Sequence, residues 1–230
     1  MLKVEDIHTY YGVSYILQGI SMEVGEAAVI GILGRNGMGK TTFMRSIIGF
    51  TRPSRGRVLF KGEEITRKRS FQIVRLGIGL VPQGRQIFPS LNVTENLTLG
   101  SRKDSRGWTL EKIFEFFPPL RQREHHPGNR LSGGEQQMLA IGRGLMTNPS
   151  LLLMDEPTEG LSPIFAQTVG QMILKLRQSG ISILLVEQNL RFAINYVDYI
   201  HILSRGTIVY STLPAELDQN REIKLRYLGV

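Results

Sequence analysis

The chain has 230 residues, more than the roughly 150 typical of one domain but within the range of a single large α/β domain that carries a subdomain. Hydrophobic residues make up 41% and charged residues 21%, which excludes a disordered chain, and the absence of cysteine excludes disulfides, thiolate metal sites and cysteine nucleophiles. The net charge of +8 favours a polyanionic neighbour, such as a nucleic acid or an anionic lipid surface.

Basic residues gather in three clusters, and each cluster taken alone is typical of a solvated loop. They are Arg52, Arg55, Arg57 and Lys61; the run Arg67–Arg69; and Arg102, Lys103 and Arg106. Only the total charge therefore favours a polyanionic partner.

Two segments near the N-terminus alternate between apolar and polar residues. They are Lys3–His8 and Ile20–Val24, and this period of two predicts antiparallel strands. Acidic Glu5 and Asp6 stand where a secretory signal would be basic and then apolar, so we expect a cytoplasmic protein. The next segment, Ala27–Leu33, is an unbroken apolar run that predicts a buried strand.

A glycine-rich turn follows this strand and leads into a predicted helix over Lys40–Ile48. Residues 34–41, GRNGMGKT, fit the G-x-x-x-x-G-K-[ST] pattern between a strand and a helix, which is the context that confirms a phosphate-binding loop. Glycines let backbone N–H groups turn inward around phosphate oxygens, and the positive end of the helix dipole points to the same place. We expect Lys40 to reach the β- and γ-phosphates and the Thr41 hydroxyl to coordinate Mg²⁺. The sequence thus predicts a nucleotide site.

The middle of the chain, residues 90–148, differs in character from what precedes it. Strand signals are few there, and helix-like patterns recur at Thr94–Gly100, Leu110–Phe117 and Ser132–Met146. We therefore expect one domain over residues 1–230, with an α/β ATPase core formed by 1–89 and 149–230 and a helical subdomain inserted at 90–148.

The turn that opens the last of these helices carries two glycines. Ser132, with Glu135 three residues later, is typical of an ordinary capping box. Gly133 and Gly134 are poor helix formers, however, and they leave the helix N-terminus bare enough for a phosphate to approach. A second phosphate-facing turn is the alternative interpretation.

Two carboxylates end the next apolar segment. Leu151–Met154 is followed by Asp155 and Glu156, and strand ends in α/β sheets open onto the ligand crevice. We expect Asp155 to hold the metal through water and Glu156 to face the γ-phosphate and polarise water. Acids at strand ends are commonly surface caps, so the phosphate loop is what favours the catalytic interpretation.

Strands and helices alternate over the rest of the chain. Apolar segments at Ile181–Val186 and Tyr199–Leu203 predict buried strands, and helices are predicted at Pro163–Gln178 and Leu190–Asn195. The alternation predicts an α/β fold with a mainly parallel sheet and an antiparallel β edge. Together with the phosphate-binding loop and the acid pair, it predicts a P-loop ATPase core. No apolar run reaches the roughly 18 residues needed to span a bilayer, so we expect no membrane-spanning segment.

Together these motifs resemble the ATP-binding subunits of ABC transporters over nearly the whole chain. Residues 131–137, LSGGEQQ, match the family's signature motif, and the resemblance implies that the signature of one subunit closes over ATP held by the phosphate loop of another. It also implies that Tyr11 stacks on adenine and that Gln83 contacts Mg²⁺ and links the site to the membrane partner. If the resemblance is set aside, ordinary packing near a strand end explains the presence of Tyr11 equally well.

The predicted site residues form three groups. The residues expected to bind ATP are Tyr11, Gly34, Arg35, Asn36, Gly37, Gly39, Lys40, Thr41, Thr42, Ser132, Gly133 and Gly134. The residues expected to bind Mg²⁺ are Thr41, Gln83 and Asp155. The residues expected to be catalytic are Glu156, Gln188 and Lys40.

Within the family, the resemblance is closest to importers of branched-chain amino acids and to the related urea and short-amide importers. It rests on residues 34–37, GRNG, 81–85, VPQGR, 155–161, DEPTEGL, and 186–189, VEQN. Two positions depart from most of the family: Ser162 stands where many members carry Asp, and Gln188 stands where most carry a His that contacts the γ-phosphate. Both are typical of the amino-acid importer branch, and both bear on the strength of this subunit's own ATPase site.

The resemblance also implies the partners. The chain should pair with itself or with a paralogous ATPase subunit, dock on two membrane-spanning permease subunits at the inner face of the plasma membrane, and depend indirectly on a periplasmic binding protein. The apolar residues that follow Gln83 suit a groove for a helix of a permease subunit, although core packing explains Phe88 equally well. They are Ile87, Phe88, Pro89 and Leu91.

Two functions of other classes are alternatives. The positive charge favours a nucleic-acid-associated ABC ATPase, but the chain has one ATPase cassette and no long heptad stretch, so nucleic acid is not the expected partner. A nucleotide-binding regulator without hydrolysis is disfavoured because Glu156 is present.

Overall fold

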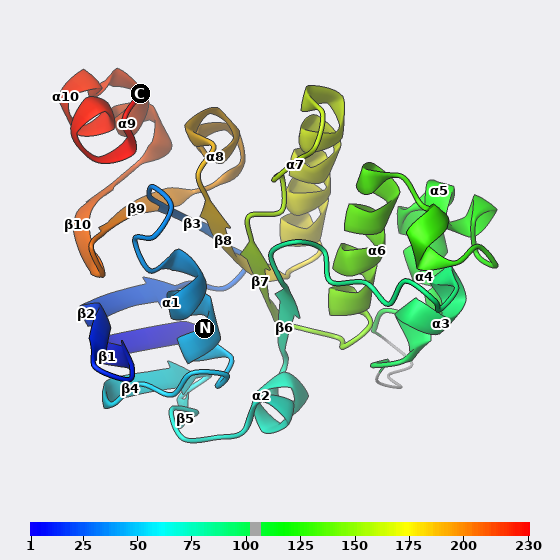
Figure 1. Ribbon diagram of the computed structural model, residues 1–230, viewed down its shortest axis with the longest axis horizontal. Coiled ribbons are helices and arrows are strands. Elements are labelled where there is room, and N and C mark those ends of the chain that lie inside the picture. The colour runs from blue at the N-terminus through cyan, green and yellow to red at the C-terminus, as the bar shows by residue number, and fades with distance from the viewer. Residues whose placement is uncertain (102–106) are drawn as a thin grey trace.

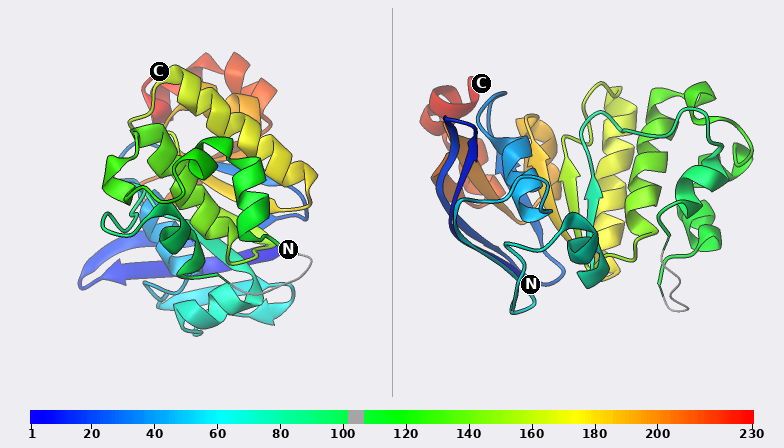
Figure 2. Two further views of the ribbon diagram at one scale, coloured as in Figure 1. Left: turned by 90° about the vertical axis from the view of Figure 1, so that its right-hand side faces the viewer. Right: turned by 60° about the horizontal axis from the view of Figure 1, so that its bottom comes forward.

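The computed structural model describes residues 1–101 and 107–230. Two β-sheets face each other across helix α1 (Lys40–Ile47), and further helices cover the opposite face of the larger sheet (Figures 1 and 2). The α/β class predicted from the alternating segments is therefore confirmed. The third basic cluster, Arg102, Lys103 and Arg106, lies outside the described residues.

The smaller sheet is antiparallel and comes from the N-terminal part of the chain. Its strands in spatial order are β2 (Ser14–Val24), β1 (Leu2–Tyr11), β4 (Arg55–Phe60) and β5 (Glu63–Glu64). Buried residues recur along β1 and β2 and pack against α1, as the alternating pattern predicts. The sequence does not signal β4, because arginines occupy it and only Val58 and Phe60 are buried.

The larger sheet has five parallel strands and one antiparallel edge strand, β10. Its strands in spatial order are β10 (Thr207–Thr212), β9 (Tyr199–Ser204), β3 (Val29–Leu33), β8 (Ser182–Glu187), β7 (Leu151–Asp155) and β6 (Ile78–Val81). In β7, Leu153 packs toward α1 and Leu152 packs toward the helices on the other face. Burial on both faces explains the unbroken apolar runs, and the mainly parallel sheet is confirmed. The strand expected from Ala27 begins at Val29, because Ala27 has a φ of +48°.

The described elements between β6 and β7 are all helical. They are α3 (Val93–Thr98), α4 (Leu110–Phe116), α5 (Pro118–Gln122), a 3₁₀ turn (Gly128–Arg130) and α6 (Gly133–Leu145). Figure 1 shows α3, α4 and α5 at the end of the molecule farthest from the smaller sheet, with α6 between them and α7 (Pro163–Gln178). This arrangement leaves the carboxyl ends of β3, β7 and β8 at one edge of the larger sheet.

The remaining helices lie on both sides of this sheet. They are α2 (Ser70–Leu76), α8 (Leu190–Tyr196), α9 (Pro214–Gln219), α10 (Arg221–Ile223) and a π-helical turn (Lys224–Leu228). Helix α7 has the predicted bounds, and the Ser162 hydroxyl caps it by accepting from the Phe165 N–H. Within residues 1–101 and 107–230, no helix is long and apolar enough to cross a membrane.

Candidate functional site

The glycines of residues 34–39 have different physical roles. A Cβ on Gly34 would lie 2.4 Å from the Leu203 carbonyl oxygen, so this glycine is required for packing against β9. Gly39 has a φ of +105°, and a Cβ there would lie 3.0 Å from the Leu17 side chain. Gly37 also has a positive φ, of +79°, but nothing lies within 4 Å of its Cβ position. Gly37 is thus the open position of the loop, where a phosphate can approach the backbone.

The Lys40 side chain folds back onto the first residues of this loop. It is only 5% exposed, and its Nζ donates to the carbonyl oxygens of Gly34 at 2.7 Å and Arg35 at 3.1 Å. The same Nζ forms an ion pair with Glu156 Oε1 at 3.0 Å. All three ammonium donors therefore have partners within the chain.

Asp155 ends β7 and is almost fully buried, with 3% of its surface exposed. Its Oδ1 atom has no hydrogen-bond partner. Burial raises the pKa of Asp155 to about 6, against the lowering effect of a hydrogen bond with Thr41. A buried carboxylate oxygen without a partner is costly, and a bound cation would satisfy it.

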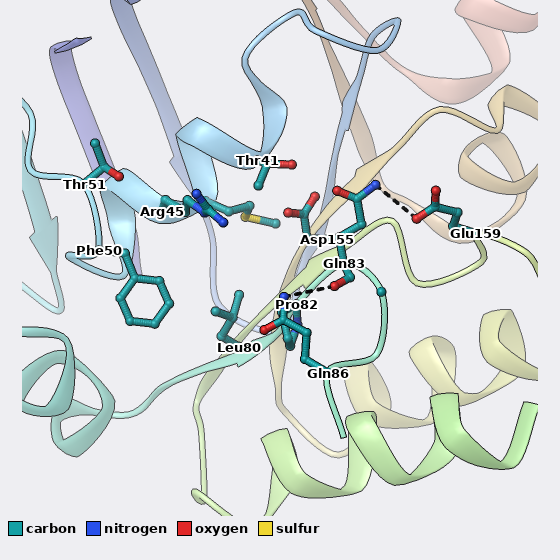
Figure 3. Close-up of a pocket in the computed structure, with 12 residues that line it drawn as sticks. Thr41, Arg45, Phe50, Thr51, Leu80, Pro82, Gln83, Gln86, Asp155 and Glu159 are labelled. Carbon is teal, nitrogen blue, oxygen red and sulfur yellow. Dashed lines mark hydrogen bonds between the residues drawn. The ribbon is translucent and has the colours of Figure 1, made fainter. Parts of the chain in front are cut away.

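Glu156 follows in a turn with a φ of +48°, and its side chain is 10% exposed. Gln83, just beyond β6, directs its Nε2 toward Glu156 Oε2 at 3.4 Å. The same Nε2 donates to Glu159 Oε2 at 3.0 Å (Figure 3). The structure therefore brings Lys40, Gln83 and Glu156 together, from three segments of the chain.

Two adjoining hollows surround this group. The residues that line a hollow of about 330 Å³ are Ile16, Asn36, Gly37, Gly39, Lys40, Thr41, Thr42, Gln83 and Glu156. A hollow of about 620 Å³ contains the three residues predicted to bind metal, Thr41, Gln83 and Asp155 (Figure 3). Hydroxyl, amide and carboxylate oxygens are the ligands that Mg²⁺ prefers, so these residues fit the ion.

Tyr11 lies at the end of β1, and its side chain is 42% exposed. Its hydroxyl lies 3.1 Å from Thr51 Oγ1, just beyond α1. It lines neither hollow, and Ile16 is the residue of the β1–β2 hairpin that lines the smaller one. An exposed ring beside α1 remains available for stacking.

The signature segment lies apart from both hollows, since none of Ser132, Gly133 and Gly134 lines them. Ser132 and Glu135 form the capping box. The Ser132 N–H donates to Glu135 Oε2 at 2.7 Å, and the Glu135 N–H donates to Ser132 Oγ at 3.3 Å. Gly134 is buried against α7, and a Cβ there would lie 2.2 Å from the Phe165 ring. The capping box is therefore present, and Gly134 has in addition a packing role that the sequence did not indicate.

Gln188 is exposed and also lies outside the two hollows. It lines a different hollow, of about 540 Å³, together with Arg191, Lys224 and other residues of α8 and the C-terminal turn. Its backbone N–H donates to Oε2 of Glu187 at 3.2 Å. The sequence reasoning missed Glu187, although an acid at the end of an apolar strand is the same signal that identified Asp155.

The comparisons with known proteins agree with this geometry. A family model described as ABC transporter matches residues 17–159. The high-affinity branched-chain amino acid transport ATP-binding protein BraG of Pseudomonas aeruginosa is 39% identical over 232 residues and covers all of both chains. The probable branched-chain amino acid transport ATP-binding protein LivG of Methanocaldococcus jannaschii is 32% identical and covers 91% of this chain and 88% of its own.

Solved structures lead to the same family. The crystal structure of a nucleotide-free ATP-binding cassette from an ABC transporter matches with a TM-score of 0.86 at 31% identity, over 95% of this chain and 93% of that one. The relatives thus indicate the same family as the phosphate loop, the acid pair and the signature turn. The resemblance inferred from these motifs is therefore confirmed. The chain belongs to the ABC transporter family, in which it is an ATP-binding subunit.

Proposed function

We propose that this subunit binds ATP with Mg²⁺ and that its ATP hydrolysis powers the import of branched-chain amino acids. The observation that carries the proposal is the convergence of the Lys40–Glu156 ion pair with the unpartnered Oδ1 of Asp155 at one edge of the sheet. The amino-acid substrate is supported by the two relatives above, whose names state branched-chain amino acid transport.

ATP binding requires Lys40 to change partners. Its ammonium moves from Glu156 and the loop carbonyls to the β- and γ-phosphates, where its charge-assisted hydrogen bonds are stronger. Glu156 is then free to accept a proton from the attacking water. Thr41, Gln83 and Asp155 hold Mg²⁺, which neutralises phosphate charge when bound.

The position of the signature turn supports a dimer as the active form. Ser132 is exposed, and together with Gly133 and Gly134 it lines neither hollow beside this chain's own phosphate loop, so this turn can face the ATP of a second subunit. We propose that the partner is either a second copy or a paralogous subunit. We also propose that residues 90–148, which include this turn, act as an inserted helical subdomain on a core formed by 1–89 and 149–230.

The larger hollow supports docking of a permease subunit from the cytoplasmic side of the membrane. Beside Gln83 it exposes apolar side chains, among them Phe50, which is 60% exposed. Residues 87–91 do not line it. Ile87 packs on the core, and Phe88 is 40% exposed with the Arg143 guanidinium 4.6 Å from its ring centroid. The docking helix is therefore expected over Phe50, rather than over the run that follows Gln83. A periplasmic binding protein would act through the permease.

Nucleic acid is disfavoured as a partner by the state of the basic clusters. Arg55, Arg57 and Lys68 each form an ion pair with a carboxylate of this chain. Their charge is thus partly neutralised in place, which reduces the attraction for phosphates that the total charge suggests.

Transport by the reconstituted complex tests the proposal. The chain is assembled in proteoliposomes with the permease subunits and the binding protein of its transporter, and the uptake of leucine, valine, urea and acetamide is compared. ATP-dependent uptake of leucine and valine is expected. Uptake of urea or acetamide alone would instead establish the short-amide alternative.

Glu156→Gln serves as the test of the ATPase site in the same vesicles. Without the carboxylate no group accepts the proton of water, so phosphate release should fall by about 100-fold or more while ATP binding persists. Phosphate release near that of the unaltered complex would contradict the role assigned to Glu156.

A further inference from the structure

Glu187 is a buried carboxylate that the mechanism above does not use. It ends β8, is 2% exposed, and lies in register with Leu33, the residue that precedes the phosphate loop. Burial raises the pKa of Glu187, and the hydrogen bonds that it accepts act in the opposite direction. Burying such a group is costly, so its hydrogen bonds must compensate.

The two oxygens of Glu187 serve two different segments. Oε1 accepts from the Thr158 N–H at 3.2 Å and from the Thr158 hydroxyl at 2.7 Å. Oε2 accepts from the backbone N–H groups of Gln188 at 3.2 Å and Asn189 at 3.3 Å. Thr158 lies two residues after Glu156, so one carboxylate joins the turn that carries Glu156 to the loop that carries Gln188.

The turn that contains Glu156 and Thr158 has an uncommon backbone conformation. Glu156 has a φ of +48°, a region that residues with a Cβ adopt uncommonly. Its N–H donates to the Val186 carbonyl at 2.9 Å, which ties the turn to β8 at a second point. The bonds between Thr158 and Glu187 are therefore part of what determines the direction of the Glu156 carboxylate.

We propose that Glu187 is a positioning residue for ATP hydrolysis. It lines neither hollow of the nucleotide site, and through its hydrogen bonds to Thr158 and to the Gln188 N–H it fixes the turn that carries Glu156, so that the Glu156 carboxylate stays directed toward the phosphate loop. The inference rests on the proposed function, in which Glu156 accepts the proton of water. A displacement of about 1 Å in a reacting group can cost about 100-fold in rate, so a loosened turn reduces turnover without removing any group that touches ATP.

Three variants test the inference in the reconstituted transporter. Glu187→Gln replaces one acceptor with an amide donor, so one of the two segments loses its hydrogen bonds. Thr158→Val keeps the side-chain volume and removes only the hydroxyl, and Thr158→Ser keeps the hydroxyl. Glu187→Gln and Thr158→Val should each lower kcat about tenfold and change KM by less than about twofold, whereas Thr158→Ser should keep kcat within about twofold.

The double variant Glu187→Gln/Thr158→Val and the melting temperature separate positioning from stability. Both changes disrupt the same set of hydrogen bonds. The kcat of the double variant should therefore be only slightly lower than that of the less active single variant. A lower Tm with unchanged kcat per folded complex would show that Glu187 is structural only. Should Glu187→Gln fail to fold, Thr158→Val and its serine counterpart decide the question.

Glu156→Gln in the same assay separates the proposed role of Glu156 from the positioning role of Glu187. If this variant keeps its turnover, the proposed role of Glu156 is wrong, and the inference about Glu187 fails with it. If Glu156→Gln abolishes turnover while Glu187→Gln and Thr158→Val leave kcat unchanged, only the inference about Glu187 is overturned.

Discussion

The carboxyl groups of the nucleotide site are stabilised in different ways in the free protein. Glu156 is paired with Lys40, so the charges of the phosphate loop and of the acid neutralise each other until ATP separates them. Asp155 has a buried oxygen with no hydrogen-bond partner and a raised pKa. The first arrangement leaves neither of the two largely buried charges unpaired in the free protein, and the second makes it favourable for a cation to bind.

Asp155 should make the free protein less stable as pH rises. Its pKa is about 6 in the folded chain against an ordinary value of 3.8 for an aspartate, so the folded chain binds this proton more tightly than the unfolded chain. The free energy of unfolding therefore falls as pH rises through this interval, and the full penalty is present above it. Asp155→Asn removes the penalty, so its stability relative to the unaltered protein should increase by about 1 kcal/mol between about pH 5 and pH 7.5.

Urea unfolding of the nucleotide-free protein at the two pH values measures this change. Glu26→Gln, at an exposed acid, is the matched control and should show no such difference. A stability difference for Asp155→Asn that stays the same at both pH values would contradict the prediction. With ATP and Mg²⁺ present the order should reverse, because the variant lacks a metal ligand.

At the scale of elements, the contact between α6 and α7 explains one glycine of the signature turn. Gly134 lies in the first turn of α6, where the ring of Phe165 from α7 occupies the space that a Cβ would need. Gly133 is different, because a Cβ there would meet only the end of the flexible Arg85 side chain, at 3.2 Å. Two adjacent glycines of one motif therefore have different structural requirements.

Gly134→Ala should lower the free energy of unfolding by about 2 kcal/mol, since the added methyl group overpacks the contact between the helices. Chemical denaturation measures the loss. Gly133→Ala is the control and should change stability by less than about 1 kcal/mol, since the Arg85 guanidinium can move. Adding Phe165→Leu to Gly134→Ala should restore part of the stability, and a lack of any restoration would contradict the steric explanation.

At the scale of the whole molecule, one chain does not bring all of the predicted site residues together. The phosphate loop and the acid pair meet at one edge of the larger sheet, whereas the signature turn begins α6 and lines neither hollow there. Gln188 likewise lies outside those hollows in this structure. We therefore expect catalysis at full rate to depend on assembly with a second subunit.

Gln188 predicts unequal sites in a heterodimer. An amide cannot become a cation as His can, so the γ-phosphate at this subunit's own site lacks one charged donor. Loss of one oriented donor can cost roughly 10²–10³ in rate. With a paralogous partner that carries His, Glu156→Gln in this chain should therefore slow ATP turnover less than the matching change in the partner.

Turnover of the two single variants in the reconstituted complex measures the asymmetry. The chain purified alone should bind ATP and hydrolyse it poorly. Equal losses, or a larger loss from the change in this chain, would mean that Gln188 supports full catalysis.

The sequence by itself determined the features that depend on local order. The phosphate loop, the acids after an apolar strand and the signature turn are each short runs, and strands buried on both faces leave an unbroken apolar signal whatever their neighbours are. With the resemblance that they carry, these runs were enough to predict the α/β fold, the family and the residues that line the smaller hollow, with the exception of Ile16. Strand β4 was missed because its arginines and exposed positions obscure the pattern.

Only the tertiary structure decided which of these groups are partners. The Lys40–Glu156 ion pair, the bonds from Thr158 to Glu187 across 29 positions, and the contact of Gly134 with Phe165 depend on the order of the strands in the sheet and on the packing of α6 against α7. The unpartnered oxygen of Asp155 depends on burial from every side. Such facts arise from long-range contacts, and no local pattern of residues encodes them.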